Sequence, residues 1–131
     1  MGICYASPEI ISILNKIKPP YNINILTQNA ALQKLNEIEK IDQQIVEINK
    51  NKLLLINELS KIHFIKNIFP SQANFILVRV DDANSRYEEL LQHGFVVRNR
   101  TKEPLCENCL RLTIGTEQEV LSLINTLKKL A

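Results

Sequence analysis

The sequence predicts an α/β layer, in which a small mixed or antiparallel sheet of about three strands is covered on one face by helices. Residues 73–80, ANFILVRV, give the strongest strand signal in the chain. Residues 109–114 alternate between apolar and polar side chains, which is typical of a strand with one buried face. Apolar residues at helical spacing come before and after these strands, and their helices would supply the cover.

Length and composition are those of an ordinary globular domain. The chain has 131 residues, of which 45% are hydrophobic and 23% charged, enough for one real core. The net charge of +2 is too small to indicate nucleic acid or a membrane surface as a partner. Tryptophan is absent, and no apolar run reaches membrane-spanning length. The three cysteines and the lack of a signal peptide point to a reducing cytoplasm.

The first residues predict a strand and then a helix. Residues 1–6 are apolar and read as a strand whose partners would belong to a larger protein. Ser7 is the expected N-cap and Pro8 the first helical residue. Pro19 and Pro20 end the helix, because the residue before a proline avoids the α region. The apolar face of this helix would consist of Ile10, Ile11, Ile13, Leu14 and Ile17.

Residues 27–63 predict one long helix, since they contain neither glycine nor proline. Thr27 is the expected N-cap, and apolar residues recur every three or four positions up to Ile62. A helix that spans the domain with one face on the sheet is the favoured interpretation. A coiled-coil dimer is the alternative, but the heptad pattern is interrupted at residues 49–55.

The second half of the chain predicts the order strand, helix, strand, strand, helix. After the strand at residues 73–80, a helix is expected at residues 85–93, with Leu90 and Leu91 inward and Gly94 as C-cap. Residues 95–98 read as a strand and residues 101–108 as a loop. The last helix would begin at Thr116, in a capping box with Glu119. Its expected inward residues are Val120, Leu121, Leu123, Ile124 and Leu127.

Arg98 and Arg111 are the candidate site residues. If residues 95–98 and 109–114 pair, these two arginines lie close together on the uncovered sheet face. Guanidinium groups side by side repel unless an anion lies between them, and their forks match phosphate or carboxylate oxygens. An anion pocket is therefore one hypothesis. Two solvated arginines are the simpler interpretation, because exposed arginines are common.

Other motifs for chemistry are sparse. Cys106 and Cys109 form a CxxC pair, which supplies only two zinc ligands, and His63 and His93 lack metal-ligand spacing. A redox CxxC would open a helix, whereas this pair ends a loop, so a structural or incidental role is favoured. No glycine-rich phosphate loop, nucleophile elbow or zinc-binding HExxH motif is present. The expectation is no metal and no catalytic residue in this chain.

Four segments together resemble the C-terminal portion of histidinol-phosphate aminotransferases, which are class I/II, fold-type-I pyridoxal-phosphate enzymes. These segments are SPEIISILNKIKPPYNIN, SQANFILVRV, GFVVRNR and NCLRLTIGT, and the resemblance covers essentially the whole chain. It implies that residues 1–6 are the trailing strand of a large cofactor domain. Residues 7–131 would form the small domain, with residues 27–63 as the interdomain helix.

The resemblance also implies an activity and a site. The reaction is amino-group transfer between histidinol phosphate and 2-oxoglutarate through pyridoxal phosphate, in histidine biosynthesis, by a cytoplasmic homodimer. Arg111 matches the arginine that holds the substrate's acidic group, and Arg98 matches a second arginine at the same phosphate site. Tyr21 and Asn74 fall in family segments without an assigned ligand. The family's Schiff-base lysine and cofactor-phosphate residues match nothing in this chain, which by itself is therefore expected neither to bind the cofactor covalently nor to transaminate.

Two alternatives accompany this interpretation. Within the superfamily, the chain also fits the small domain of a threonine-phosphate decarboxylase or another class I/II aminotransferase. Outside it, the chain could be a helical interaction module that dimerises through residues 27–63.

Overall fold

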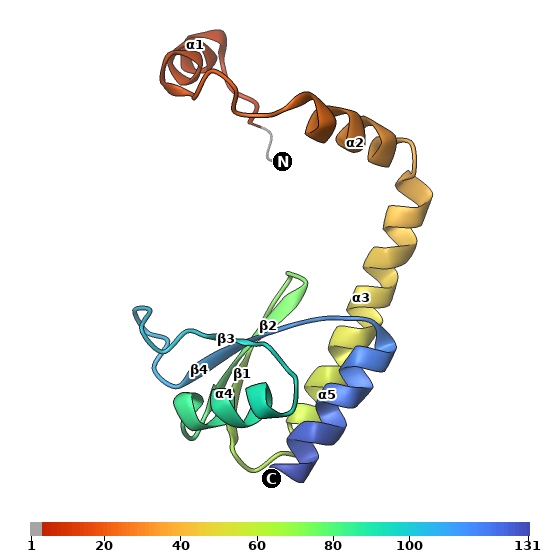
Figure 1. The fold of residues 1–131 in the computed structure, drawn as a ribbon, viewed down its shortest axis with the longest axis vertical. Helices are drawn as coiled ribbons and strands as arrows, with labels where there is room; N and C mark the ends of the chain where they lie inside the picture. Colours follow the sequence, from red (N-terminus) through yellow and green to blue (C-terminus); the bar gives the residue numbers. More distant parts are fainter. Residues whose placement is uncertain (1–3) are drawn as a thin grey trace. The chain divides into compact units, whose positions relative to one another are not determined.

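The computed structural model describes residues 4–131, in two compact units formed by Met1–Asp42 and Gln43–Ala131 (Figure 1). The strand predicted for residues 1–6 is not found at residues 4–6, and residues 1–3 lie outside the described part. A lone strand has no hydrogen-bond partner, which accounts for its absence at residues 4–6. None of the helices at residues 4–131 is long and apolar enough to cross a membrane.

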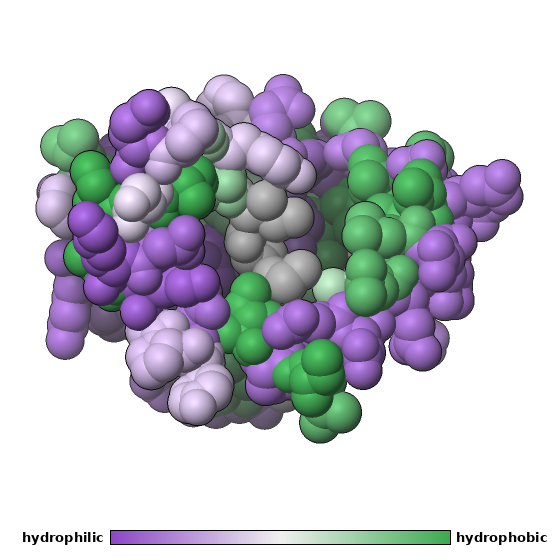
Figure 2. Space-filling model, turned by 90° about the horizontal axis from the view of Figure 1, so that it is seen from above, coloured by the Kyte–Doolittle hydropathy of each residue, from purple (hydrophilic) through white to green (hydrophobic). Residues whose placement is uncertain are grey.

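The first unit consists of helices without a core of their own. Helix α1 (Pro8–Ile17) begins as predicted, with Ser7 at the N-cap and proline at the first position. Helix α2 (Ile25–Leu35) is capped by Asn24, whose side chain accepts the Thr27 N–H at 2.9 Å. Neither helix has a buried residue, and Figure 2 shows hydrophobic groups among hydrophilic ones on the surface that it displays. The apolar face predicted for α1 is therefore exposed at Ile10, Ile13, Leu14 and Ile17.

The long helix predicted for residues 27–63 is wrong, because two helices occupy this range. Helix α2 ends at Leu35, and α3 (Ile38–Leu59) begins after a turn at Asn36 and Glu37. The Asn36 and Glu37 amides donate to carbonyls three residues back, at 3.1 and 3.0 Å, so the α-helical hydrogen-bond pattern is interrupted. The C-terminal end also differs from the prediction, because α3 ends at Leu59 and not at His63.

Four antiparallel strands form one sheet in the order β1-β2-β4-β3. They are β1 (Ile65–Phe69), β2 (Phe75–Val80), β3 (Arg98–Asn99) and β4 (Cys109–Thr113). The predicted fold class is confirmed, with one strand more than expected. Strand β1 escaped prediction because its register shifts between Ile65 and Asn67, which interrupts the alternation of apolar residues.

Helices α3, α4 (Ala83–Gln92) and α5 (Glu117–Lys129) contribute the apolar side chains that bury one face of the sheet (Figure 1). On that face, β2 and β4 place alternate residues in the core, as predicted for β4. The strands, together with the residue after β4, contribute the core side chains Ile76, Val78, Val80, Leu110, Leu112 and Ile114. From the helices come Leu55, Leu59, Ala83, Leu90, Val120, Leu123, Ile124 and Leu127. The other sheet face carries none of these helices.

The ends of the remaining elements agree with the sequence in most details. Thr116 and Glu119 form the predicted capping box at the start of α5. Gly94 follows α4 with φ +82°, a left-handed conformation that glycine adopts without strain. Strand β3 shares only Arg98 with the predicted strand 95–98, since the residues that pair with β4 are Arg98 and Asn99. Leu91 and Leu121 were expected to point inward and are 42% and 45% exposed.

Candidate functional site on the open sheet face

Arg98 and Arg111 lie directly opposite each other on neighbouring strands. The register of β3 and β4 pairs Arg98 with Arg111 and Asn99 with Leu110. Directly opposed residues of an antiparallel pair project to the same face, about 5 Å apart at their Cβ atoms. Leu110, the neighbour of Arg111 in β4, is buried beneath the helices. Successive residues of a strand point to opposite faces, so both arginines are on the open face. The predicted proximity of these residues is confirmed, and their ligand remains a prediction.

Arg111 is held against an aromatic ring. Its guanidinium carbon lies 4.9 Å from the centre of the Phe75 ring, within the range of a cation–π contact. The Arg111 Nε atom is buried and has no hydrogen-bond acceptor among residues 4–131. Buried donors are nearly always satisfied in native proteins, so an unsatisfied one next to a charged face marks a place for an acceptor. Arg111 is thus oriented by the Phe75 ring, and its Nε–H has no acceptor among the described residues.

Arg79 is the third arginine on this face, and its donors are already in use. It pairs with Cys109 of β4, and its guanidinium lies 5.5 Å from the centre of the Phe69 ring. Its Nε and Nη2 atoms donate to the carbonyls of Glu107 and Leu105, each at 3.1 Å, and the Glu107 carboxylate is 3.8 Å away. Arg79 therefore anchors the loop between β3 and β4.

No carboxylate at residues 4–131 pairs with Arg98 or Arg111, whereas the nearby Arg79 and Arg100 each lie close to a glutamate. Arg100, two residues beyond Arg98, lies 3.3 Å from Glu103. Two adjacent positive charges on β3 and β4 consequently have no counter-charge from the described chain. Such a pair attracts a dianion better than a monoanion, because each guanidinium can bind separate oxygens of one tetrahedral group.

The loop that follows β3 ends in the CxxC pair. The Cys109 N–H donates to the Cys106 carbonyl at 3.0 Å, closing a turn that places Asn108 at φ +55°. Both thiols are free; Cys109 is buried, and its Sγ contacts the Glu107 carbonyl at 3.6 Å. Over residues 4–131, no three His, Cys, Asp or Glu side chains gather as metal ligands. The turn fixes the loop that Arg79 holds.

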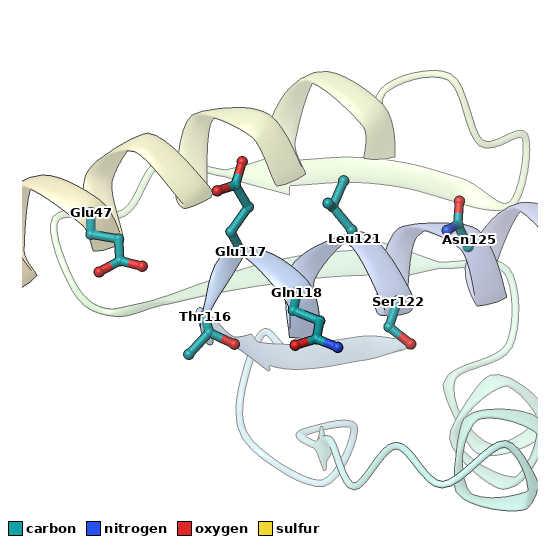
Figure 3. A pocket seen from close by; sticks show the side chains of 7 residues that line it. All are labelled: Glu47, Thr116, Glu117, Gln118, Leu121, Ser122 and Asn125. Atoms are coloured by element: carbon teal, nitrogen blue, oxygen red, sulfur yellow. The ribbon is translucent and has the colours of Figure 1, made fainter.

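Neither of two grooves on the second unit is lined by both arginines. One groove runs along α5 and the neighbouring part of α3 (Figure 3), and no cation lines it. Its lining residues are Glu47, Thr116, Glu117, Gln118, Leu121, Ser122 and Asn125. Figure 3 shows Glu117 and Leu121 pointing toward α3. A second groove includes Arg98 with Tyr87, Val96, Val97 and Asn99, so one of the two arginines also borders a hollow beside α4.

Lys52 is the buried lysine of the described chain, and its ammonium group is committed. It is 7% exposed and donates to the carbonyls of Ser71 and Ala73 at 3.3 and 3.0 Å. These contacts hold the connection between β1 and β2. A lysine that forms a Schiff base must reach a ligand cavity, and Lys52 does not fit that requirement.

The phenylalanine contacts of Arg111 and Arg79 were not predicted from the sequence. Phe75 and Phe69 lie beneath Arg111 and Arg79, and the alternation in residues 75–80 would have placed Phe75, Leu77 and Arg79 on one face. Tyr21 and Asn74, which had no predicted ligand, are exposed. Asn74 has a structural role, since its carbonyl accepts the Ile114 N–H at 2.9 Å.

Comparison with known proteins places the chain in a family. The profile of aminotransferase class I and II matches residues 1–127. The chain belongs to this family. It is similar to the histidinol-phosphate aminotransferases of Flavobacterium johnsoniae, with 52% identity over 130 residues, and Christiangramia forsetii, with 49% over 130 residues. These alignments include 99% of the chain but 37% of each relative, so the chain spans little more than a third of their length.

Solved structures agree with the family in fold. The histidinol-phosphate aminotransferase of Clostridium acetobutylicum superimposes with a TM-score of 0.85 at 30% identity, over 93% of this chain and 38% of that one. The L-threonine-O-3-phosphate decarboxylase of Porphyromonas gingivalis gives a TM-score of 0.81 at 19% identity, over 95% and 39% of the two chains. The second likeness shows the shared fold alone. The family resemblance predicted from the four sequence segments is confirmed.

Proposed function

We propose that this chain is the C-terminal part of a histidinol-phosphate aminotransferase, in which Arg98 and Arg111 bind the substrate phosphate. The enzyme would transfer an amino group between histidinol phosphate and 2-oxoglutarate in histidine biosynthesis. The observation that carries the proposal is the arginine pair: Arg98 and Arg111 are opposed in register and have no carboxylate partner in residues 4–131. Similarity to histidinol-phosphate aminotransferases at about half identity supports the choice of substrate.

Charge and geometry favour a phosphate over a carboxylate at this place. A phosphate monoester carries a charge of about −1.5 to −2 at neutral pH and offers three terminal oxygens. One guanidinium fork is sufficient for a carboxylate, whereas two adjacent guanidiniums match the charge and the oxygens of a phosphate. The buried Arg111 Nε supplies a further donor close to the ring of Phe75. These residues would hold the substrate's phosphate end and so orient its amino end.

Pyridoxal phosphate, which class I/II aminotransferases use, would supply the amino-transfer chemistry in the whole enzyme. In this proposal its anchor lies in the large domain, outside the 131 residues, since the buried Lys52 is committed to two carbonyls. The contribution of residues 7–131 is then to bind and orient the substrate. The chain alone would neither bind the cofactor covalently nor transaminate.

The wider assembly is part of the same proposal. The exposed isoleucines and leucines of α1 suit a surface that the large domain or a second subunit covers, in a homodimer. The three free cysteines agree with a reducing cytoplasm. Residues 1–6 would pair as an added strand of the large domain.

Substitution of the arginines tests the site in a full-length enzyme that carries this chain as its C-terminal part. Arg111→Ala should raise the KM for histidinol phosphate about 10- to 100-fold, because each charged hydrogen bond contributes about 1.5–3 kcal/mol. Arg98→Ala should act in the same direction. Steady-state kinetics with histidinol phosphate as the varied substrate measure both effects.

Arg100→Ala is the matched control, since it removes one positive charge from the neighbouring loop, where Glu103 already pairs with it. Its KM should stay within about twofold of the unsubstituted enzyme, as expected for an exposed pair. An unchanged KM in Arg111→Ala would refute the phosphate assignment. A preference for L-threonine-O-3-phosphate over histidinol phosphate would keep the phosphate site and refute the proposed substrate.

A further inference from the structure

We propose that Phe75 is a positioning residue for phosphate binding, which acts by fixing the guanidinium of Arg111. This inference rests on the proposed function and adds to it a residue that does not touch the phosphate itself. Its basis is the contact of Arg111 with the Phe75 ring, at 4.9 Å, together with the rigid attachment of Phe75 to the rest of the unit.

The register of the sheet explains how the two side chains meet. Phe75 pairs with Thr113 and Leu77 pairs with Arg111, so Phe75 and Arg111 are diagonal neighbours on the open face. Diagonal neighbours are within reach when one side chain is aromatic and the other is long. Both residues lie in the two central strands of the sheet, β2 and β4, and Phe75 at the start of β2 pairs with Thr113 of β4.

Phe75 is also held by hydrogen bonds in the partly buried turn that precedes β2. Ser71 donates its hydroxyl to the Phe75 carbonyl at 2.5 Å and accepts the Ala73 N–H at 3.1 Å. Lys52 of α3 donates to the Ser71 and Ala73 carbonyls. Thus α3 anchors the turn before β2, the turn fixes the start of β2, and the ring there supports Arg111.

The physical effect of the ring is to limit where the guanidinium can go. An aromatic face attracts a cation electrostatically, and a long arginine side chain otherwise loses much rotamer freedom when it binds a ligand. With that freedom already restricted by the ring, the N–H groups are directed to the phosphate before the substrate arrives. Preorganisation of this kind increases affinity without a new contact to the ligand.

Phe69 provides a matched comparison on the same sheet face. It lies beneath Arg79 at 5.5 Å, but the Arg79 donors are bound to the carbonyls of Leu105 and Glu107. The same type of contact therefore supports a loop at Phe69 and a free guanidinium at Phe75. Removal of each ring separates a general loss of aromatic packing from a specific effect on Arg111.

The kinetic test uses Phe75→Leu, Phe75→Tyr and Phe69→Leu in a full-length enzyme that carries this chain. Phe75→Leu should raise the KM for histidinol phosphate about 2- to 30-fold, the range of a cation–π contact, with a smaller change in kcat. It should also reduce the preference for histidinol phosphate over unphosphorylated histidinol by a similar factor. Phe75→Tyr keeps an aromatic face and should restore both values, and Phe69→Leu should leave the preference unchanged.

A spectroscopic test on the 131-residue chain keeps the inference testable if a variant enzyme is inactive. In an arginine-selective nitrogen-15 spectrum, the buried Nε–H of Arg111 should exchange slowly with water and shift when inorganic phosphate is added. In Phe75→Leu, or in Phe75→Met with its unbranched apolar side chain, exchange should become as fast as that of exposed arginines and the phosphate-induced shift should shrink.

The two proposals fail in different ways. If Arg111→Ala raises the KM but Phe75→Leu and Phe75→Met leave both the KM and the Arg111 Nε–H exchange unchanged, the positioning role is refuted and the phosphate site stands. If Arg111→Ala itself has no effect on the KM, the proposed function fails first. A loss of preference in Phe69→Leu equal to that in Phe75→Leu would also refute the specific role of Phe75.

Discussion

The same pair of residue types, an arginine over a phenylalanine, occurs three times in the second unit, and two of these pairs have opposite electrostatic surroundings. In α4, the Arg86 guanidinium lies 4.1 Å from the centre of the buried Phe64 ring and pairs with Asp81 at 2.8 Å and Glu89 at 2.9 Å. On the open sheet face, Arg111 lies over Phe75 without an acidic partner from residues 4–131. The first arginine has its counter-charges within the chain, whereas the second has none among the described residues.

This difference predicts that Arg86 contributes to the stability of the fold and Arg111 to ligand binding. The Arg86 group also reaches the Leu130 carbonyl at 3.4 Å, so it connects α4 with the residue after α5. Its loss would remove contacts that the folded chain makes on its own. Arg111 has no ion pair within the described residues, and under the proposed function its loss should affect phosphate binding more than folding.

The largest expected effect contrasts neighbouring residues of β4 on opposite faces. Leu112→Ala should lower the free energy of unfolding by about 2–5 kcal/mol, because Leu112 is 2% exposed and its truncation leaves a cavity. Arg111→Ala should change it by less than about 1 kcal/mol. Urea unfolding of the 131-residue chain, followed by circular dichroism, measures both. Equal losses would contradict the division between a stabilising face and a binding face.

A medium effect is expected at Arg86. Arg86→Ala should lower the free energy of unfolding by about 1–3 kcal/mol, because it leaves Asp81 and Glu89 without their partner and uncovers Phe64. The same urea measurement applies, and Arg98→Ala serves as a control because Arg98 is exposed and has no described ion pair. If Arg98→Ala destabilised the chain as much as Arg86→Ala, the comparison between the two arginine environments would be wrong.

The smallest effect is a pH dependence. A hydrogen bond from Arg86 lowers the pKa of Asp81 to about 2 in the folded chain, from an ordinary value of 3.8. Since the folded-state pKa is depressed, the stabilisation is fully present above about pH 4 and is lost as the pH falls toward 2. The free energy of unfolding should therefore fall less between pH 4 and 2 in Asp81→Asn than in the unsubstituted chain. The difference should be less than about 1 kcal/mol, as expected for a partly exposed pair.

Glu58 provides the second arm of the pH measurement. Hydrogen bonds from Lys128 and Lys61 lower the pKa of Glu58 to about 2, so it titrates in the same acid range. Asp81→Asn should accordingly remove only part of the acid sensitivity, and Glu58→Gln another part. If the urea midpoint fell as steeply with pH in both variants as in the unsubstituted chain, other carboxyl groups would control acid unfolding.

Local sequence patterns predicted the elements whose determinants are adjacent in the chain. Alternation placed Leu110, Leu112 and Arg111 on the correct faces, and the capping box at Thr116 marked the start of α5. The pairing of Arg98 with Arg111 was predictable because both strands were recognised and are separated by one loop. For these residues, local preference and tertiary structure agree.

Features that depend on distant residues or on a local interruption escaped prediction. The break at Asn36 arises from a few shifted hydrogen bonds in a stretch without glycine or proline, and the register shift in β1 hides its alternation. Lys52 drew no prediction, because the carbonyls that hold it in the interior lie about 20 positions further along the chain. The Phe75–Arg111 contact required the register between β2 and β4, which periodicity within one strand does not specify.

The position of α5 in the fold has a consequence for biosynthesis. Its core residues cover strands made much earlier, and Asn51 of α3 donates to the Gly115 carbonyl, 64 residues further along. During translation, the apolar side of β1 and β2 therefore leaves the ribosome before the part of its cover that α5 supplies. Until α5 emerges, this exposed apolar surface makes the nascent chain prone to aggregation.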